Sequence, residues 1–220
     1  MAVELDVEQT LELSSNWKFD GPDSDGVTTM NFRTIGRTGK MRIQIANTPA
    51  KADAWIQKFV IDRKVKELGF DIEWKPNWQR GQAERKASLL QLAARDEVLL
   101  VQMIHLKPAA TPPLLAQVLC DARIRKAGVG ILQDAKKMAK DWKSPVEGLV
   151  DISDELKARQ CPDAGTPTPK GDSISLARAS AKVLGIDMCK RKPVVMSNWE
   201  ARSLSQAQIL YAALDAWVGR

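Results

Sequence analysis

Residues 67–74 of the chain read Glu-Leu-Gly-Phe-Asp-Ile-Glu-Trp, and this stretch decides the fold that we predict for the rest. It is an apolar run typical of a buried strand, interrupted by two internal carboxylates. Because side chains alternate along a strand, Asp71 and Glu73 share one face and the residues between and beside them share the other. Adjacent carboxylates repel each other unless a hard divalent cation lies between them. The stretch therefore favours either a metal site or a half-exposed strand face.

The segments around this stretch predict an α/β fold with a mixed central sheet flanked by helices. Apolar runs and alternating patterns predict further strands at 30–34, 41–45, 88–93, 98–104 and 124–129. Three neighbouring strands, 67–74, 88–93 and 98–104, favour an antiparallel meander. Helical periodicity is found at 49–59, 114–119, 152–158, 174–184 and 206–217.

Two later stretches place carboxylates where they can join a site. Tyr211 and Asp215 are four residues apart in the last predicted helix, so their side chains lie on one helical face. Asp134 follows a strand and a glycine-containing turn, in the first turns of the next helix, where a carboxylate is favoured by the helix N-terminus. Taken alone, the first pair is typical of a surface hydrogen bond, and Asp134 is typical of a helix N-terminal charge.

Charge is distributed unevenly along the chain. The formal net charge is +6, yet residues 1–26 hold seven acidic residues and one basic residue, which leaves +12 on the remainder. A folded part this basic favours a polyanionic partner, with nucleic acid as the default candidate, although a solvated basic surface has the same composition. Because residues 21–26 form turns and contribute little core, we predict an acidic mobile leader at 1–29 and one domain at 30–220.

The cysteines and the hydropathy exclude several classes of protein. Cys120, Cys161 and Cys189 are far apart and lack a Cys-x-x-Cys pair, so neither a disulfide framework nor a zinc site is predicted. No run approaches the roughly 18 apolar residues of a membrane span. We therefore expect a soluble protein of a reducing, intracellular compartment, with no membrane partner.

Taken in order, these stretches resemble the DEDDy-type 3′-to-5′ exonucleases, and among them the Werner-type exonuclease domains. The similarity runs from residue 66 to residue 218, and its marks are FDIEW at 70–74, LLQLA at 89–93, KAGVGI at 126–131 followed by Asp134, SNW at 197–199 and YAALDA at 211–216. A tyrosine four residues before the last aspartate marks the subclass that uses Tyr in place of His. The resemblance implies a ribonuclease H-like fold.

The resemblance also implies roles for the site residues. Asp71, Glu73 and Asp215 would ligate a first Mg²⁺ or Mn²⁺ ion, and Asp71 would bridge to a second ion whose shell includes Asp134, through water. Tyr211 would orient the attacking water. Oxygen ligands suit these ions, and two ions roughly 3.5 to 4 Å apart can stabilise both the entering and the leaving oxygen of an in-line displacement.

Aromatic and basic residues near these stretches are candidates for contacts with nucleic acid. Trp74 either stacks on the terminal nucleotide or packs in the core. The basic residues either follow the phosphate backbone or are solvated loop charges. These basic residues are Lys75, Arg80, Arg85, Lys190, Arg191 and Lys192.

The implied function is removal of nucleoside monophosphates from the 3′ ends of DNA by two-metal-ion hydrolysis. The alternatives are an RNA 3′-5′ exonuclease of the ribonuclease D type, because related nucleases share every catalytic residue, and a catalytically silent nucleic-acid-binding adaptor. Four converging carboxylates argue against the adaptor, since a silent module has no physical need for them. The nucleus is the favoured location, with the cytoplasm and organelles as alternatives. We assume a monomer, and a helicase or repair protein acting in trans is a candidate partner.

Overall fold

The computed structural model describes residues 18–24, 26–34, 37–77, 81–155, 176, 180 and 192–220. Within these residues, the centre of the molecule is a sheet of eight strands in the order β1-β2-β3-β6-β5-β4-β7-β8. The strands are β1 (Lys18–Asp20), β2 (Val27–Thr34), β3 (Arg37–Ala46), β4 (Glu67–Glu73), β5 (Leu89–Ala94), β6 (Glu97–Val101), β7 (Arg125–Gly128) and β8 (Leu149–Asp151). The meander β4-β5-β6 is antiparallel, whereas β3 with β6, β4 with β7, and β7 with β8 are parallel. The predicted α/β class with a mixed sheet is confirmed.

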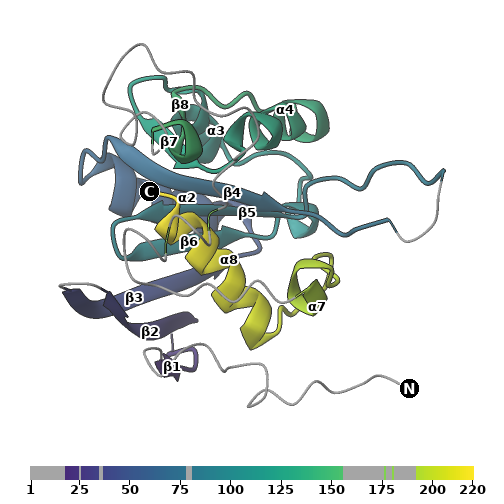
Figure 1. Cartoon of the computed structure of the whole chain (residues 1–220). Coiled ribbons are helices and arrows are strands. Elements are labelled where there is room, and N and C mark those ends of the chain that lie inside the picture. The colour runs from purple at the N-terminus through teal and green to yellow at the C-terminus, as the bar shows by residue number, and fades with distance from the viewer. Residues whose placement is uncertain are drawn as a thin grey trace, which may run out of the picture.

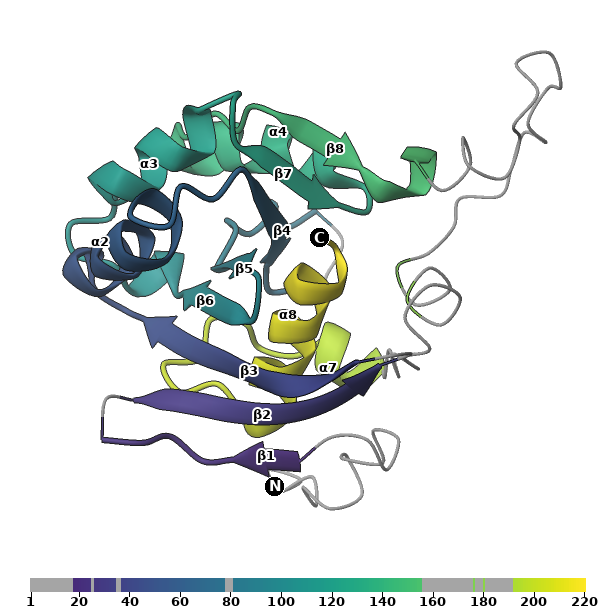
Figure 2. The ribbon, with the colours of Figure 1, turned by 90° about the vertical axis from the view of Figure 1, so that its left-hand side faces the viewer.

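Helices cover both faces of this sheet (Figure 1). They are α2 (Pro49–Ile56), the π-helical turn η1 (Gln57–Ile61), the 3-10 turn η2 (Met103–His105), α3 (Pro113–Cys120), α4 (Ile131–Trp142), α7 (Lys192–Val195) and α8 (Gln206–Val218). Figure 2 shows α8 on one side of β4, β5 and β6, and α2 and α3 on the other. In the part of the chain that is described, no helix is both long and apolar enough to cross a lipid bilayer.

The two faces of β4 divide the core into two clusters, as the alternation in its sequence predicts. Leu68, Phe70 and Ile72 are buried in the cluster that also contains residues of α2, α3 and α4. The residues between them point to the opposite face, on which α8 packs against β4 and β5. Asp71 and Glu73 therefore lie on the α8 face of the sheet.

The close approach of α8 to β4 depends on Gly69. A Cβ atom at this position would lie 1.8 Å from the backbone oxygen of Ala216 and 3.3 Å from the Cβ of Ala93. No side chain fits in that space, because the obstructing atom belongs to the helix backbone. Gly69 is two residues from Asp71 in β4, and Ala216 follows Asp215 in α8, so this contact sets the spacing between the two carboxylates.

The beginning of α8 is fixed by a capping box. The Ser205 hydroxyl accepts a hydrogen bond from the Gln208 N–H at 3.3 Å, and the Gln208 side-chain oxygen accepts one from the Ser205 N–H at 2.9 Å. The Gln208 amide also donates to the Ser197 hydroxyl at 2.9 Å. Near the other end of the helix, the Trp217 indole N–H donates to Asp96 at 3.3 Å. Hydrogen bonds thus anchor both ends of α8, and they fix the position of the residues between the two ends.

The boundary predicted between leader and domain differs from the structure. Residue 30 falls inside β2, which begins at Val27 and pairs with β1 on one side and with β3 on the other. Lys18–Asp20 therefore belongs to the sheet, because its backbone completes hydrogen bonds along the edge of β2. Residues 1–17 of the predicted leader lie outside the described residues.

The bounds of other predicted strands and helices also differ from those in the structure. The strand predicted at 98–104 ends at Val101, and the 3-10 turn η2 follows after Gln102. The side-chain amide of Gln102 donates to the backbone oxygens of Ala201 and Arg202, both at 3.1 Å. β8 was not predicted, since a strand of three residues is too short to show a period. The helix predicted at 152–158 is described only at 152–155, and that at 174–184 lies outside the described residues apart from positions 176 and 180.

Lys126 of β7 is fully buried, with an exposed fraction of 0%. Its ammonium group donates hydrogen bonds to the backbone oxygens of Val118 at 3.0 Å, Asp121 at 2.9 Å and Ile124 at 2.9 Å. These bonds join the end of α3 and the turn after it to β7. Lys126 thereby holds the strand that leads to α4.

We expect Lys126→Met to lower the free energy of unfolding by roughly 2 to 4 kcal/mol, because three buried or partly buried carbonyl oxygens lose this donor. Urea unfolding followed by circular dichroism measures the change. The matched control is Lys136→Met at an exposed position of α4, which should change the free energy of unfolding by less than about 0.5 kcal/mol. Parent-like stability of Lys126→Met would contradict this role.

Candidate active site

Three carboxylates from two elements converge on the α8 face of the sheet. Asp71 and Glu73 of β4 and Asp215 of α8 each offer an oxygen that lies within 4.8 Å of the other two. Asp71 and Glu73 are half-buried, and Asp215 is 3% exposed. Oxygen atoms grouped in this way are the ligands that hard divalent cations such as Mg²⁺ and Mn²⁺ take. The group can therefore hold a metal ion.

These carboxylates line a cavity of about 360 Å³, which Asp134 and Tyr211 also line. The structure thus brings together all five residues that the sequence predicted for catalysis. Asp134 comes from α4 and Tyr211 from α8, so the cavity is built where β4, the turn between β7 and α4, and α8 meet. Asp134 lies on the cavity wall rather than within the group of three.

The turn between β7 and α4 places Asp134. Gly130 caps α4 with a φ of +73°, a left-handed conformation that glycine adopts without strain. Its N–H donates to a carboxylate oxygen of Asp151 at 2.9 Å. Burial, and after it the charge of Asp151, raise the pKa of the Asp134 carboxyl to about 7. A cation that binds beside Asp134 near neutral pH therefore displaces a proton from part of the molecules.

Tyr211 lies one helical turn before Asp215. It is half-buried, and its ring centroid is 6.1 Å from that of the buried Trp199. Burial first, and then the negative charges of Asp215 and Glu73, raise the pKa of the Tyr211 phenol far above its usual value. The phenol therefore keeps its proton at neutral pH and can donate a hydrogen bond, and Asp215 is one acceptor within its reach.

Trp74 packs in the core, which is one of the two roles that its sequence context left open, and stacking on the terminal nucleotide stays a prediction. Its half-buried ring packs against the core cluster of α2, α3 and α4, and it also lines the cavity. The Lys137 ammonium group lies 4.8 Å from the ring centroid. The residue thus contacts both the core and the cavity.

The basic residues predicted to contact nucleic acid are only partly described. Lys75 is half-buried and Arg85 is exposed, and both form ion pairs with Glu200 at 3.8 Å. Lys192 is exposed at the start of α7. The remaining predicted contacts, Arg80, Lys190 and Arg191, lie outside the described residues.

The sequence reasoning missed Asp151, which holds the turn that carries Asp134. Its carboxylate accepts the N–H of Gly130 at 2.9 Å and that of Ser153 at 3.0 Å. A signal was present, because Asp151 is the last residue of a strand that runs parallel to β7, and polar residues at such strand ends often build sites. Recognising that signal required recognising β8.

Comparison with known proteins also indicates a 3′-5′ exonuclease. Residues 43–220 match the profile of a 3′-5′ exonuclease family. The bifunctional 3′-5′ exonuclease/ATP-dependent helicase WRN of Mus musculus is 31% identical over 154 residues, which cover 69% of this chain and 10% of the mouse protein. A 3′-5′ exonuclease of Drosophila grimshawi is 28% identical over 181 residues, which cover 80% of this chain and 51% of the fly protein. The chain therefore spans no more than about half the length of these relatives.

A solved structure resembles the chain in its fold. The RNase D of Escherichia coli, described as an exoribonuclease involved in structured RNA processing, matches with a TM-score of 0.62 at 20% identity. The match covers 81% of this chain and 42% of the bacterial one. This likeness confirms the ribonuclease H-like architecture that the sequence predicted.

Proposed function

The chain belongs to the 3′-5′ exonuclease family, and we propose that it removes nucleoside 5′-monophosphates from the 3′ ends of DNA by two-metal-ion hydrolysis. The observation that carries this proposal is the grouping of Asp71, Glu73 and Asp215 within 4.8 Å of one another. DNA is proposed as the substrate because of the similarity to the Werner-type domains. The likeness to an exoribonuclease in fold keeps RNA as the second candidate.

The proposed roles of the side chains follow from their positions. Asp71, Glu73 and Asp215 would hold a first Mg²⁺ or Mn²⁺ ion, and Asp71 with Asp134 would serve a second. Two such ions activate a water molecule and neutralise charge on the entering and leaving oxygens. Tyr211, whose hydroxyl can donate or accept a hydrogen bond, would bond to the attacking water and orient it. The water oxygen would form a bond to phosphorus as the bond from phosphorus to the 3′ oxygen of the preceding nucleotide breaks, and the proton that the water loses balances the one that the 3′ oxygen takes up.

We expect Tyr211→Phe to lower the single-turnover rate by about 10- to 100-fold, because a hydrogen bond made in the transition state is lost. Metal affinity should change little, since the phenol is no ligand of the ion in this proposal. Asp215→Asn should lose both turnover and metal affinity. Calorimetric titration with Mn²⁺, beside single-turnover cleavage, separates the two. The proposed role is wrong if Tyr211→Phe cleaves at the parent rate or loses metal as severely as Asp215→Asn.

Digestion of matched DNA and RNA strands tests the proposed function. Each strand carries a 5′ label and is incubated with the protein in Mn²⁺ or in excess chelator. The proposal predicts stepwise shortening of DNA from its 3′ end, release of nucleoside 5′-monophosphates, slower loss of RNA, and no cleavage in chelator. Faster digestion of RNA would favour the ribonuclease D-type alternative. Binding of both strands without cleavage would favour the adaptor.

A further inference from the structure

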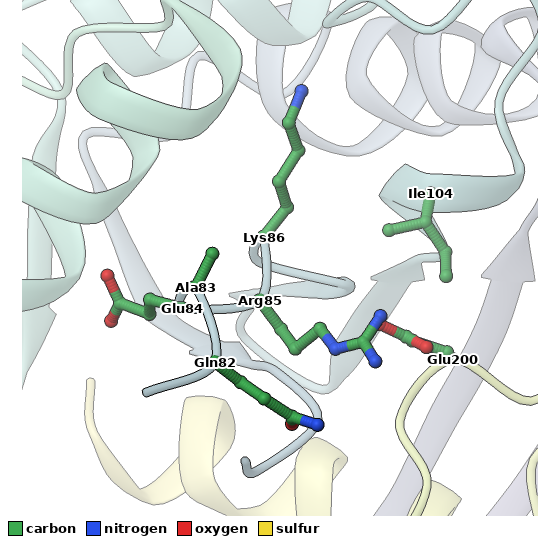
Figure 3. A pocket seen from close by; sticks show the side chains of 7 residues that line it. All are labelled: Gln82, Ala83, Glu84, Arg85, Lys86, Ile104 and Glu200. Carbon is green, nitrogen blue, oxygen red and sulfur yellow. The ribbon is translucent and has the colours of Figure 1, made fainter. Parts of the chain in front are cut away.

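A second cavity, of about 600 Å³, lies in the loop that follows β4 (Figure 3). Its walls are residues 82–86 of this loop, Ile104 of η2, and Glu200 before α8. Figure 3 shows the Arg85 side chain extended toward the Glu200 carboxylate, whereas Lys86 and Glu84 point elsewhere. The cavity therefore lies between a basic loop and the segment that connects α7 to α8.

The loop that lines this second cavity returns to the strand of the candidate active site. The Ser88 N–H donates to the backbone oxygen of Glu73 at 2.8 Å, so the loop returns to the end of the strand that carries the metal-binding group. Arg85 precedes Ser88 by three residues, a span of at most about 11 Å of backbone. Lys75 follows Glu73 by two residues on the other arm of the loop. A strand that ends at Asp71 and Glu73 can thus reach both cations.

The Glu200 carboxylate pairs with both of these cations, at distances too long for a hydrogen bond. The Lys75 ammonium nitrogen and an Arg85 guanidinium nitrogen each lie 3.8 Å from an oxygen of Glu200. By contrast, the guanidinium of Arg123 approaches Asp121 to 2.8 Å, a true charge-assisted hydrogen bond. The side chains of Lys75, Arg85 and Glu200 are 30%, 48% and 26% exposed. Such loose and partly solvated pairs contribute little to stability, so another anion can take the place of Glu200.

The other acidic residue of the cavity wall is engaged away from these cations. The Glu84 carboxylate pairs with Lys137 at 3.2 Å and with Lys140 at 2.9 Å. The Lys86 ammonium group lies 5.3 Å from the ring centroid of Trp142. The acidic residue of the cavity wall that pairs with Lys75 and Arg85 is therefore Glu200.

We propose that this cavity binds a phosphate group of the substrate strand, upstream of the terminal nucleotide, and that Glu200 occupies Lys75 and Arg85 until that phosphate replaces it. The inference rests on the proposed function, because it takes the bound strand to end at Asp71 and Glu73. The ligand is a phosphodiester of a single-stranded nucleic acid. Because the Glu200 carboxylate competes with this phosphate for Lys75 and Arg85, it weakens binding of the strand.

Glu200→Gln tests this inference, because it keeps the shape of the side chain and removes the competing charge. It should tighten binding of a fluorescein-labelled single DNA strand about three- to tenfold at low salt. Arg85→Ala should weaken binding by a similar factor and reduce the slope of log affinity against log salt by about 0.7. Fluorescence anisotropy in excess chelator measures both without cleavage. Unchanged or weaker binding by Glu200→Gln would overturn the inference.

Two controls separate this inference from the proposed function. Glu67→Gln removes the same charge at the opposite end of β4, where Glu67 pairs with Arg125 at 3.5 Å, and it should bind like the parent protein. Thymidine 5′-monophosphate p-nitrophenyl ester has no upstream phosphate, so Glu200→Gln and Arg85→Ala should change its hydrolysis by a smaller factor than they change binding of the strand, and Glu67→Gln should hydrolyse it like the parent. A change in ester hydrolysis as large as the change in strand binding would overturn the inference and assign Glu200 to the chemistry or to the loop fold. A parent protein that hydrolyses neither ester nor strand would refute the proposed function, and the binding measurement would still decide the role of Glu200.

Discussion

Asp71→Asn should lower kcat/KM on a labelled DNA strand at least roughly a thousandfold, a loss of about 4 kcal/mol of transition-state stabilisation. Asp71 is one of the three carboxylates of the group formed with Glu73 and Asp215, and in the proposed function it serves both ions. An amide in its place supplies one neutral oxygen and no charge. The substitution should therefore weaken binding of both ions, and with it the stabilisation of negative charge in the transition state.

The same substitution should leave the fold intact. The Asp71 carboxylate accepts the N–H of Ile72 at 2.9 Å, and an asparagine oxygen can accept the same bond. Without a metal, three neighbouring carboxylates repel one another, so removing one charge should keep or raise the melting temperature. Differential scanning calorimetry in chelator measures it. Asp62→Asn, at an exposed position after η1, is the control and should retain full turnover. Unfolding of Asp71→Asn, or parent-like cleavage by it, would contradict the assigned role.

Gly69→Ala should lower turnover at least about a hundredfold, because displacing a catalytic group by about 1 Å already costs that much. The added methyl group would lie 1.8 Å from the backbone oxygen of Ala216, so α8 must move away from β4. Asp215 and Tyr211 move with the helix, whereas Asp71 and Glu73 stay with the strand. The overpacking should also lower the free energy of unfolding by roughly 1 to 3 kcal/mol.

A matched glycine separates the effect of the clash from that of the substitution itself. A Cβ at Gly21 would meet nothing within 4 Å, so Gly21→Ala should keep both stability and turnover. Steady-state cleavage and urea unfolding of the two variants give the comparison. If Gly69→Ala were as active as the parent, the contact between Gly69 and Ala216 would not set the position of Asp215.

Sequence alone predicts those features of this site that depend on the periodicity of a single strand or helix. Alternation along β4 places Asp71 and Glu73 together, and four-residue spacing places Tyr211 and Asp215 together. Resemblance to a family of nucleases then joined these stretches, which lie far apart in the chain. The mixed sheet followed from the order of strands and helices, because short connections favour antiparallel neighbours.

The features that could not be predicted depend on contacts between distant segments. Gly69 interrupts a strand pattern without showing which backbone presses against it. Glu200 meets Lys75 and Arg85 only because the segment before α8 lies beside the loop after β4. Asp151 became recognisable as a support of the Gly130 turn once β8 was placed beside β7. None of these pairs has a sequence period, so the fold had to be known first.

Anomalous diffraction from crystals of the protein grown with Mn²⁺ tests the central claim most directly. The account predicts an anomalous peak between Asp71, Glu73 and Asp215, with carboxylate oxygens about 2.1 to 2.3 Å from the ion. The peak should be absent or much weaker in Asp71→Asn crystals that keep the same fold. A parent protein that hydrolyses DNA from its 3′ end, yet shows its only ordered Mn²⁺ away from these three carboxylates, would contradict the claim.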